Sequence, residues 1–171
     1  MDETVRYGYR LRPGAQAVAA LSAEWGRCRW LWNEAVNQQR SGNRPTYAKL
    51  SKMLTTARAR NGWLRDGSQV AQQEMLRTYG AALDHSFKVK GRGRPGIKRK
   101  RDTLPSLNYS RNGFRITGGR LKLPKGVSIP VVWSRELPGE PTSVRVYQDS
   151  LGHLYASFVV KREMTPAPAA S

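Results

Sequence analysis

Polar and apolar residues alternate along the first part of the chain. Every second residue from Val5 to Leu11 is apolar, and the residues between them are arginine or glycine. This period of two predicts a half-buried strand over residues 4–12, ended by Pro13 and Gly14. No neighbouring segment is available to pair with this strand, so we expect its partner elsewhere in the chain.

A helical period follows, and residues 13–87 are predicted to form a helical lobe. Apolar residues three and four positions apart predict a helix from Ala15 to about Trp25 and, after an interruption at Gly26, a second helix to about Arg40. Two helices joined at a glycine have the outline of a helix-turn-helix, here over residues 14–40, although any helical hairpin shares this outline.

Two more helices complete this lobe. Thr46 is a typical N-cap residue and predicts a third helix. The turn at residues 66–68 opens a longer helix to about Phe87, with an apolar stripe on one side. The other side is polar, as exposed helix faces normally are, yet its residue types can bond base edges or phosphates. The residues on that side are Gln69, Gln73 and Arg77.

After the helices the pattern is that of short strands. Residues 118–119 are a Gly-Gly hairpin signal, a second hairpin is expected around residues 150–152, and Pro130 indicates an edge strand or a bulge. Five or so antiparallel strands over residues 109–162, completed by the first strand, predict a small β-barrel. The expected fold class is therefore α+β, an antiparallel β-barrel interrupted by the helical lobe, with a disordered tail at residues 163–171.

Residues 88–108 form a basic linker between the helices and the strands. Residues 88–101 include eight basic residues and no acidic one, so this segment has too little apolar area to bury itself. It can lie along a polyphosphate, where each neutralised phosphate releases counterions; the alternative is a solvated linker or a targeting run. The candidate phosphate or RNA contacts are Lys88, Lys90, Arg92, Arg94, Lys98, Arg99, Lys100 and Arg101, together with Arg27 and Arg29 of the second helix.

The composition extends this electrostatic pattern to the whole chain. Among its 171 residues, 30 Lys and Arg against 12 Asp and Glu give a formal charge of +18, for which a nucleic acid is the expected partner. No membrane association is expected, because no stretch of about twenty apolar residues occurs; with no signal-peptide core, the expected location is the cytoplasm. The single Cys28 and two separated histidines give no readable metal site, and no cofactor is expected.

Six segments together carry a family resemblance. They are YGYRLRP (7–13), WGRCRWLWNEAV (25–36), TYAKLSKML (46–54), WLRDGSQVAQQEMLRTYGAALDHSF (63–87), GGRLKLPKG (118–126) and RELPGEPTSVRVYQDSLGHLYASFVV (135–160). In this order they resemble the N-terminal part of TnpB, the OrfB-type transposase of insertion sequences and a relative of type V CRISPR effectors. The resemblance covers nearly the whole chain.

The resemblance implies an oligonucleotide-gripping barrel and a helical recognition lobe that together hold a guide RNA and a short DNA duplex beside the target. By this resemblance the residues at the target-adjacent duplex are Tyr47, Ser51, Gln69, Gln73 and Ser110. Tyr47 and Ser51 are one helical turn apart, as are Gln69 and Gln73, so each pair shares a helix face. Relatives have a basic residue in place of Gln69, so the sequence of the duplex motif does not follow from the resemblance.

The sequence also differs from the family pattern in one respect. The family continues into a RuvC-type nuclease, whose acidic residues hold two divalent metals, and into a zinc ribbon, and this sequence contains neither. We therefore expect a part that binds nucleic acid without a catalytic centre, whereas full-length relatives are metal-dependent DNA endonucleases. Mg²⁺ enters only if a separate RuvC domain completes the chain. The alternatives are the recognition half of a split nuclease with a separate catalytic chain, and a simple helix-turn-helix regulator that reads DNA with residues 27–40.

Overall fold

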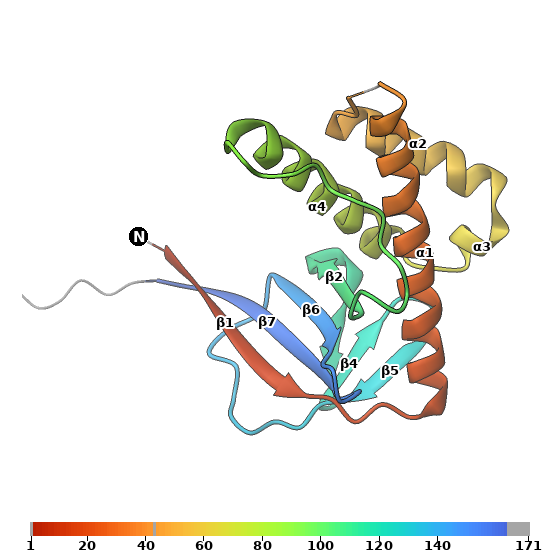
Figure 1. Cartoon of the computed structure of the whole chain (residues 1–171). Helices are drawn as coiled ribbons and strands as arrows, with labels where there is room; N and C mark the ends of the chain where they lie inside the picture. Colours follow the sequence, from red (N-terminus) through yellow and green to blue (C-terminus); the bar gives the residue numbers. More distant parts are fainter. Residues whose placement is uncertain (1, 43, 164–171) are drawn as a thin grey trace, which may run out of the picture.

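The computed structural model describes residues 2–42 and 44–163 and places a group of helices beside antiparallel strands (Figure 1). The helices are α1 (Ala15–Arg40), α2 (Tyr47–Arg60), α3 (Gly62–Arg65) and α4 (Gln69–Lys88). The strands are β1 (Asp2–Arg10), β2 (Ser106–Ser110), β3 (Arg115–Thr117), β4 (Arg120–Leu123), β5 (Val127–Pro130), β6 (Ser143–Gln148) and β7 (Leu154–Glu163), with a 3-10 helix at Arg111–Gly113. The α+β class is confirmed. The tail predicted to be disordered lies, from residue 164 on, outside the described residues.

The first strand pairs with the last. β1 runs antiparallel to β7, with Tyr9 opposite Ala156, so β7 is the distant partner that the isolated first strand required. The strand order of this sheet is β1-β7-β6-β2. On its inward face the ring of Phe158 packs against Tyr9 and Trp133, with ring centroids 5.8 and 5.9 Å apart. This aromatic cluster accounts for the apolar side of the period-two pattern.

A second sheet, in the order β3-β4-β5, meets the first at the end of β1. Leu11 forms a bridge with Val131, and the Val132 N–H donates to the Arg10 carbonyl at 2.9 Å. Within residues 2–42 and 44–163 the strands do not close into a hydrogen-bonded ring. The predicted closed barrel is therefore not confirmed.

The two hairpins were predicted correctly. Gly118 and Gly119 connect β3 to β4 with φ values of 60° and 74°, which glycine adopts without strain. Gly152, with φ of 87°, lies in the turn between β6 and β7. Pro130 ends β5, which is an edge strand of its sheet, as a residue without a backbone donor requires.

α1 is one continuous helix of 26 residues, so the predicted break at Gly26 and the helix-turn-helix-like start over residues 14–40 are wrong. A glycine costs a helix about 1 kcal/mol relative to alanine, and apolar burial on both sides of Gly26 outweighs this cost. The buried apolar residues of α1 are Ala17, Leu21, Trp25, Cys28, Leu31, Trp32, Ala35 and Val36. A Cβ on Gly26 would lie 4.0 Å from the Trp63 ring, so α1 passes close to α3 at this point.

The starts of α2 and α4 follow from their capping residues. The Thr46 hydroxyl accepts a hydrogen bond from the Lys49 N–H at 3.3 Å, and the Ser68 hydroxyl accepts one from the Ala71 N–H at 3.1 Å. Each cap satisfies a backbone donor that the first helical turn leaves free. The two polar helix faces therefore begin at fixed positions.

Candidate nucleic-acid interface

Tyr47 is the centre of a polar cluster on the exposed side of α2 and α4. Its hydroxyl accepts hydrogen bonds from Gln73 Nε2 at 2.6 Å and from Arg77 Nη2 at 3.0 Å. The Arg77 guanidinium also lies 4.7 Å from the centroid of the Tyr47 ring, and Tyr47 is 40% exposed. The structure thus brings together Tyr47 and Gln73, two of the predicted duplex contacts, and adds Arg77, which the sequence places on the same side of α4.

Of the other three predicted duplex contacts, two lie on the helices next to this cluster and one lies on a strand. Ser51 lies half-buried one turn after Tyr47 on α2, and Gln69 lies exposed one turn before Gln73 on α4. Ser110 is half-buried and belongs to the end of β2 rather than to the helices. We define the helical face as Tyr47, Ser51, Gln69, Gln73 and Arg77.

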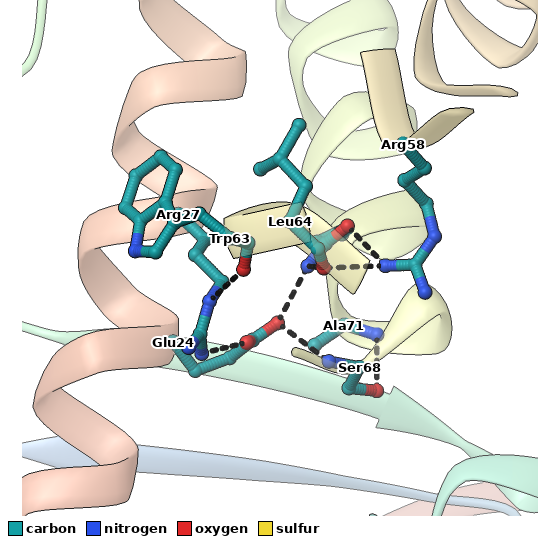
Figure 2. A network of polar contacts seen from close by, with 8 residues as sticks. Glu24, Arg27, Arg58, Trp63, Leu64, Ser68 and Ala71 are labelled. Atoms are coloured by element: carbon teal, nitrogen blue, oxygen red, sulfur yellow. Dashed lines mark hydrogen bonds and ion pairs between the residues drawn. The ribbon is translucent and has the colours of Figure 1, made fainter. Parts of the chain in front are cut away.

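A buried polar network connects α1 to the start of α4 and so sets the position of the helical face (Figure 2). Glu24 of α1 is 5% exposed, and its carboxylate accepts from the Ser68 N–H at 3.1 Å and from Gln72 Nε2 at 3.3 Å. Arg27 Nη1 donates to the other carboxylate oxygen at 2.9 Å. Burial raises the pKa of the Glu24 carboxyl, against the opposing hydrogen bond and charge of Arg27.

The same network extends to α2 and α3 through Gln72. Gln72 is fully buried, donates to the Leu64 carbonyl at 3.0 Å and accepts from Arg58 Nη1 at 2.7 Å. A Cβ on Gly67 would lie 2.0 Å from a Glu24 carboxylate oxygen, so any other residue in the turn before α4 would displace the Glu24 side chain. Four helices therefore share one satisfied polar centre.

Arg27 and Arg29 are not the free phosphate contacts that the sequence predicted. The Arg27 side chain is 12% exposed, and its Nε donates to the Trp63 carbonyl at 2.7 Å in addition to the Glu24 contact. Arg29 is half-buried, and its Nε is buried without a hydrogen-bond partner in the described part of the chain. Sequence periodicity placed both on the polar side of a short helix, but α3 and α4 lie against the continuous α1, and Trp63 of α3 contacts this side of it.

The segment between α4 and β2, residues 89–105, has no regular secondary structure and is here called the basic strap. It is not a free linker, because the side-chain amide of Asn33 in α1 forms hydrogen bonds with both the N–H and the carbonyl of Lys98. Asn33 Nδ2 donates to the Lys98 carbonyl at 3.1 Å, and the Lys98 N–H donates to Asn33 Oδ1 at 2.8 Å. Trp32 Nε1 donates to the Gly96 carbonyl at 2.8 Å. In Figure 1 the strap runs from α4 across the helices to β2.

Several basic side chains of the strap are used in holding it. Arg94 Nη1 donates to the Ser86 carbonyl at 2.9 Å, and its guanidinium lies 3.6 Å from the Phe87 ring centroid, with the Arg44 guanidinium at 3.9 Å from the same ring. Lys98 Nζ lies 4.2 Å from the Trp32 ring centroid, and burial lowers the pKa of Lys98. These contacts position the strap rather than offer cations to a ligand.

The remaining cations of the strap point into solvent. Arg99 forms an ion pair with Asp102 at 2.8 Å, and Arg101 lies 3.9 Å from the same carboxylate with a side chain that is 78% exposed. The other exposed basic residues are Lys88 at the end of α4, Lys90, Arg92 and Lys100. A fixed backbone thus presents a row of cations, which suits a polyphosphate chain.

No cluster of three or more His, Cys, Asp or Glu residues that could hold a metal ion occurs in the described ranges. No helix in that part of the chain is long and apolar enough to span a membrane. Comparison with protein-family models and with curated proteins found no match to this chain.

Proposed function

We propose that this chain binds RNA and double-stranded DNA as the nucleic-acid-binding part of a TnpB-like protein. The observation that carries the proposal is the basic strap, whose backbone is fixed by Asn33 and Trp32 while Lys90, Arg92 and Lys100 remain exposed. Cations on a fixed backbone need less ordering on binding than cations on a free linker. The net charge of +18 adds a long-range attraction for any polyanion.

In this proposal the helical face meets the DNA duplex. Tyr47, Gln73 and Arg77 form a connected set of donors and acceptors on an exposed surface, and glutamine and arginine are residue types that read base edges in the major groove. Ser110 lies at the end of β2, next to the place where α4 packs against the segment after that strand through Val70 and Gly113.

The TnpB resemblance supports the choice of partners. It suggests a guide-type RNA on the strap and strands, a barrel-like arrangement of the two sheets, and a short duplex at the helices. Mg²⁺ has a role only if a RuvC domain, in a separate nuclease chain for example, completes the assembly. The helix-turn-helix alternative loses its basis, because α1 contains no turn.

A salt series on RNA copurified with the expressed protein tests this proposal. We expect a defined RNA to stay bound at salt concentrations that release random duplex DNA of matched length, because organised contacts add to the counterion-release term. If the RNA and the random duplex dissociate together with one steep salt dependence, the chain is only a basic surface and the proposal is wrong.

A further inference from the structure

The outward face of the β1-β7-β6-β2 sheet carries a pair of stacked tyrosines. Tyr155 on β7 lies opposite Tyr147 on β6, and their ring centroids are 5.5 Å apart with an interplanar angle of 22°. The neighbouring residues Val146 and Ala156 point the other way and are buried. The tyrosine pair therefore lies on the side of the sheet away from the core.

Arginines flank this pair on the same face. Arg145, two residues before Tyr147 on β6, is exposed and places its guanidinium 4.7 Å from the Tyr147 ring centroid. Arg10 of β1 is exposed and lies opposite Tyr155. Gly8 is opposite Ser157, and a Cβ at Gly8 would meet nothing within 4 Å, so the surface beside the rings is open.

The charged residues near the tyrosine pair on this face are all basic. The outward positions 4–10 of β1, 155–161 of β7, 143–147 of β6 and 106–110 of β2 include no Asp or Glu and add the exposed cations Arg6 and Lys161. An acidic group, Asp149, lies beside Tyr155 in the turn after β6. Its carboxylate accepts from the backbone N–H groups of Leu151 and His153 at 3.0 and 2.8 Å and lies 3.5 Å from His153 Nδ1. It also interacts with the Tyr155 hydroxyl, so it is held at the end of the tyrosine pair rather than over the rings.

We propose that this face, here called the tyrosine platform and comprising Tyr147, Tyr155, Arg145 and Arg10, binds unpaired nucleotides. A base extends the tyrosine stack, and the two arginines contact the phosphates on either side of that base. Stacking accepts any base, because every base has a π face, and the cations favour the phosphodiester backbone. We favour a polyanion over a protein partner, because exposed cations lie beside the tyrosine pair on this face.

This inference rests on the proposed nucleic-acid binding and adds a second surface to it. The basic strap is proposed to bind phosphates and the helical face to bind duplex DNA. The tyrosine platform instead requires bases that are not paired. It therefore predicts that the single-stranded part of any bound nucleic acid crosses the outward face of the sheet.

The test uses the full chain and measures fluorescence anisotropy of labelled oligouridylate, oligothymidylate and a duplex at one salt concentration. The variant Tyr147→Val with Tyr155→Val keeps a strand-forming residue at each position but removes stacking. We expect its affinity for the single strands to fall about tenfold or more and its duplex affinity to stay within about twofold of wild type. Tyr147→Phe with Tyr155→Phe is the matched control and should retain single-strand affinity. The two single strands show whether RNA or DNA is the preferred source of the unpaired bases.

Wild-type binding of oligouridylate by the valine variant would overturn the tyrosine platform while leaving the proposed function intact. Absence of binding to every probe by the wild-type chain would overturn both. Arg145→Gln provides a second test that does not depend on the valine variant folding, because Arg145 is exposed. This variant should weaken single-strand binding and reduce its salt dependence, and unchanged single-strand binding would contradict the arginine contact.

Discussion

At the scale of single residues, Glu24 connects the stability of the chain to the placement of its candidate interface. Its carboxylate is held by Arg27, Gln72 and the Ser68 backbone, and Ser68 caps α4, the helix that carries Gln69 and Gln73. Each partner is needed, because an unpaired charge at a site that is 5% exposed would be costly. The polar centre therefore explains why four helices that are polar on their outer sides keep one arrangement.

The pKa of Glu24 leads to a prediction about pH. A carboxyl whose pKa is raised in the folded state loses stabilising effect as the pH rises from its ordinary value, 4.5, through the raised value. We expect the free energy of unfolding of the wild type, minus that of Glu24→Gln, to decrease over this pH interval, because glutamine does not titrate. Urea unfolding of both proteins at a series of pH values measures this difference. If this difference increased with pH, the pKa of Glu24 would not be raised by burial, and the prediction would be wrong.

At the scale of elements, the sequence predicted the first strand, the hairpins and most helix ends. It did not predict the continuity of α1 or strand β2, whose first residues it placed in the basic linker. The alternation from Val5 to Leu11 and the Gly118-Gly119 turn act over a few residues, so local pattern was sufficient. The continuity of α1 and the attachment of the basic strap depend on contacts between distant segments. Asn33 binds Lys98 across 65 positions, a distance at which periodicity carries no information.

Gly26 offers a direct test of the continuous helix. Gly26→Ala should increase the free energy of unfolding by about 1 kcal/mol, since alanine is the better helix former and the new Cβ would meet only atoms at 3.8 and 4.0 Å. Thermal or urea unfolding measures the change. A clear loss of stability would mean that residue 26 occupies a turn, as the helix-turn-helix prediction required.

Asn33 tests whether the basic strap is organised by α1. Asn33→Ala removes both side-chain contacts to Lys98, and we expect faster hydrogen exchange at the Lys98 amide together with an RNA affinity about fivefold lower, a loss of about 1 kcal/mol. The salt dependence should stay unchanged, because no charge is removed. Asn37→Ala, an exposed change on the same helix, is the control. Equal exchange and equal affinity in Asn33→Ala and wild type would show that the strap keeps its position without this contact.

At the scale of the whole molecule, three surfaces together form the proposed nucleic-acid interface: the basic strap, the helical face and the tyrosine platform. The sequence predicted most residues of the first two from charge, helix faces and the TnpB resemblance. It did not predict that Arg27 turns inward to Glu24 and that Arg29 is half-buried, because both depend on contacts between distant segments. It also did not single out the tyrosine platform, because Tyr147 and Tyr155 become neighbours only through strand pairing.

The measurement that tests the central claim most directly compares the salt dependence of RNA binding in two variants of equal charge. One variant replaces Lys90, Arg92 and Lys100 of the basic strap by glutamine; the other replaces the exposed residues Lys52, Arg60 and Arg115, which lie outside all three surfaces. We expect the strap variant to reduce the slope of log affinity against log salt by about 2 and the other variant to change it much less. Equal reductions in both variants would show that net charge alone binds RNA and would contradict the account.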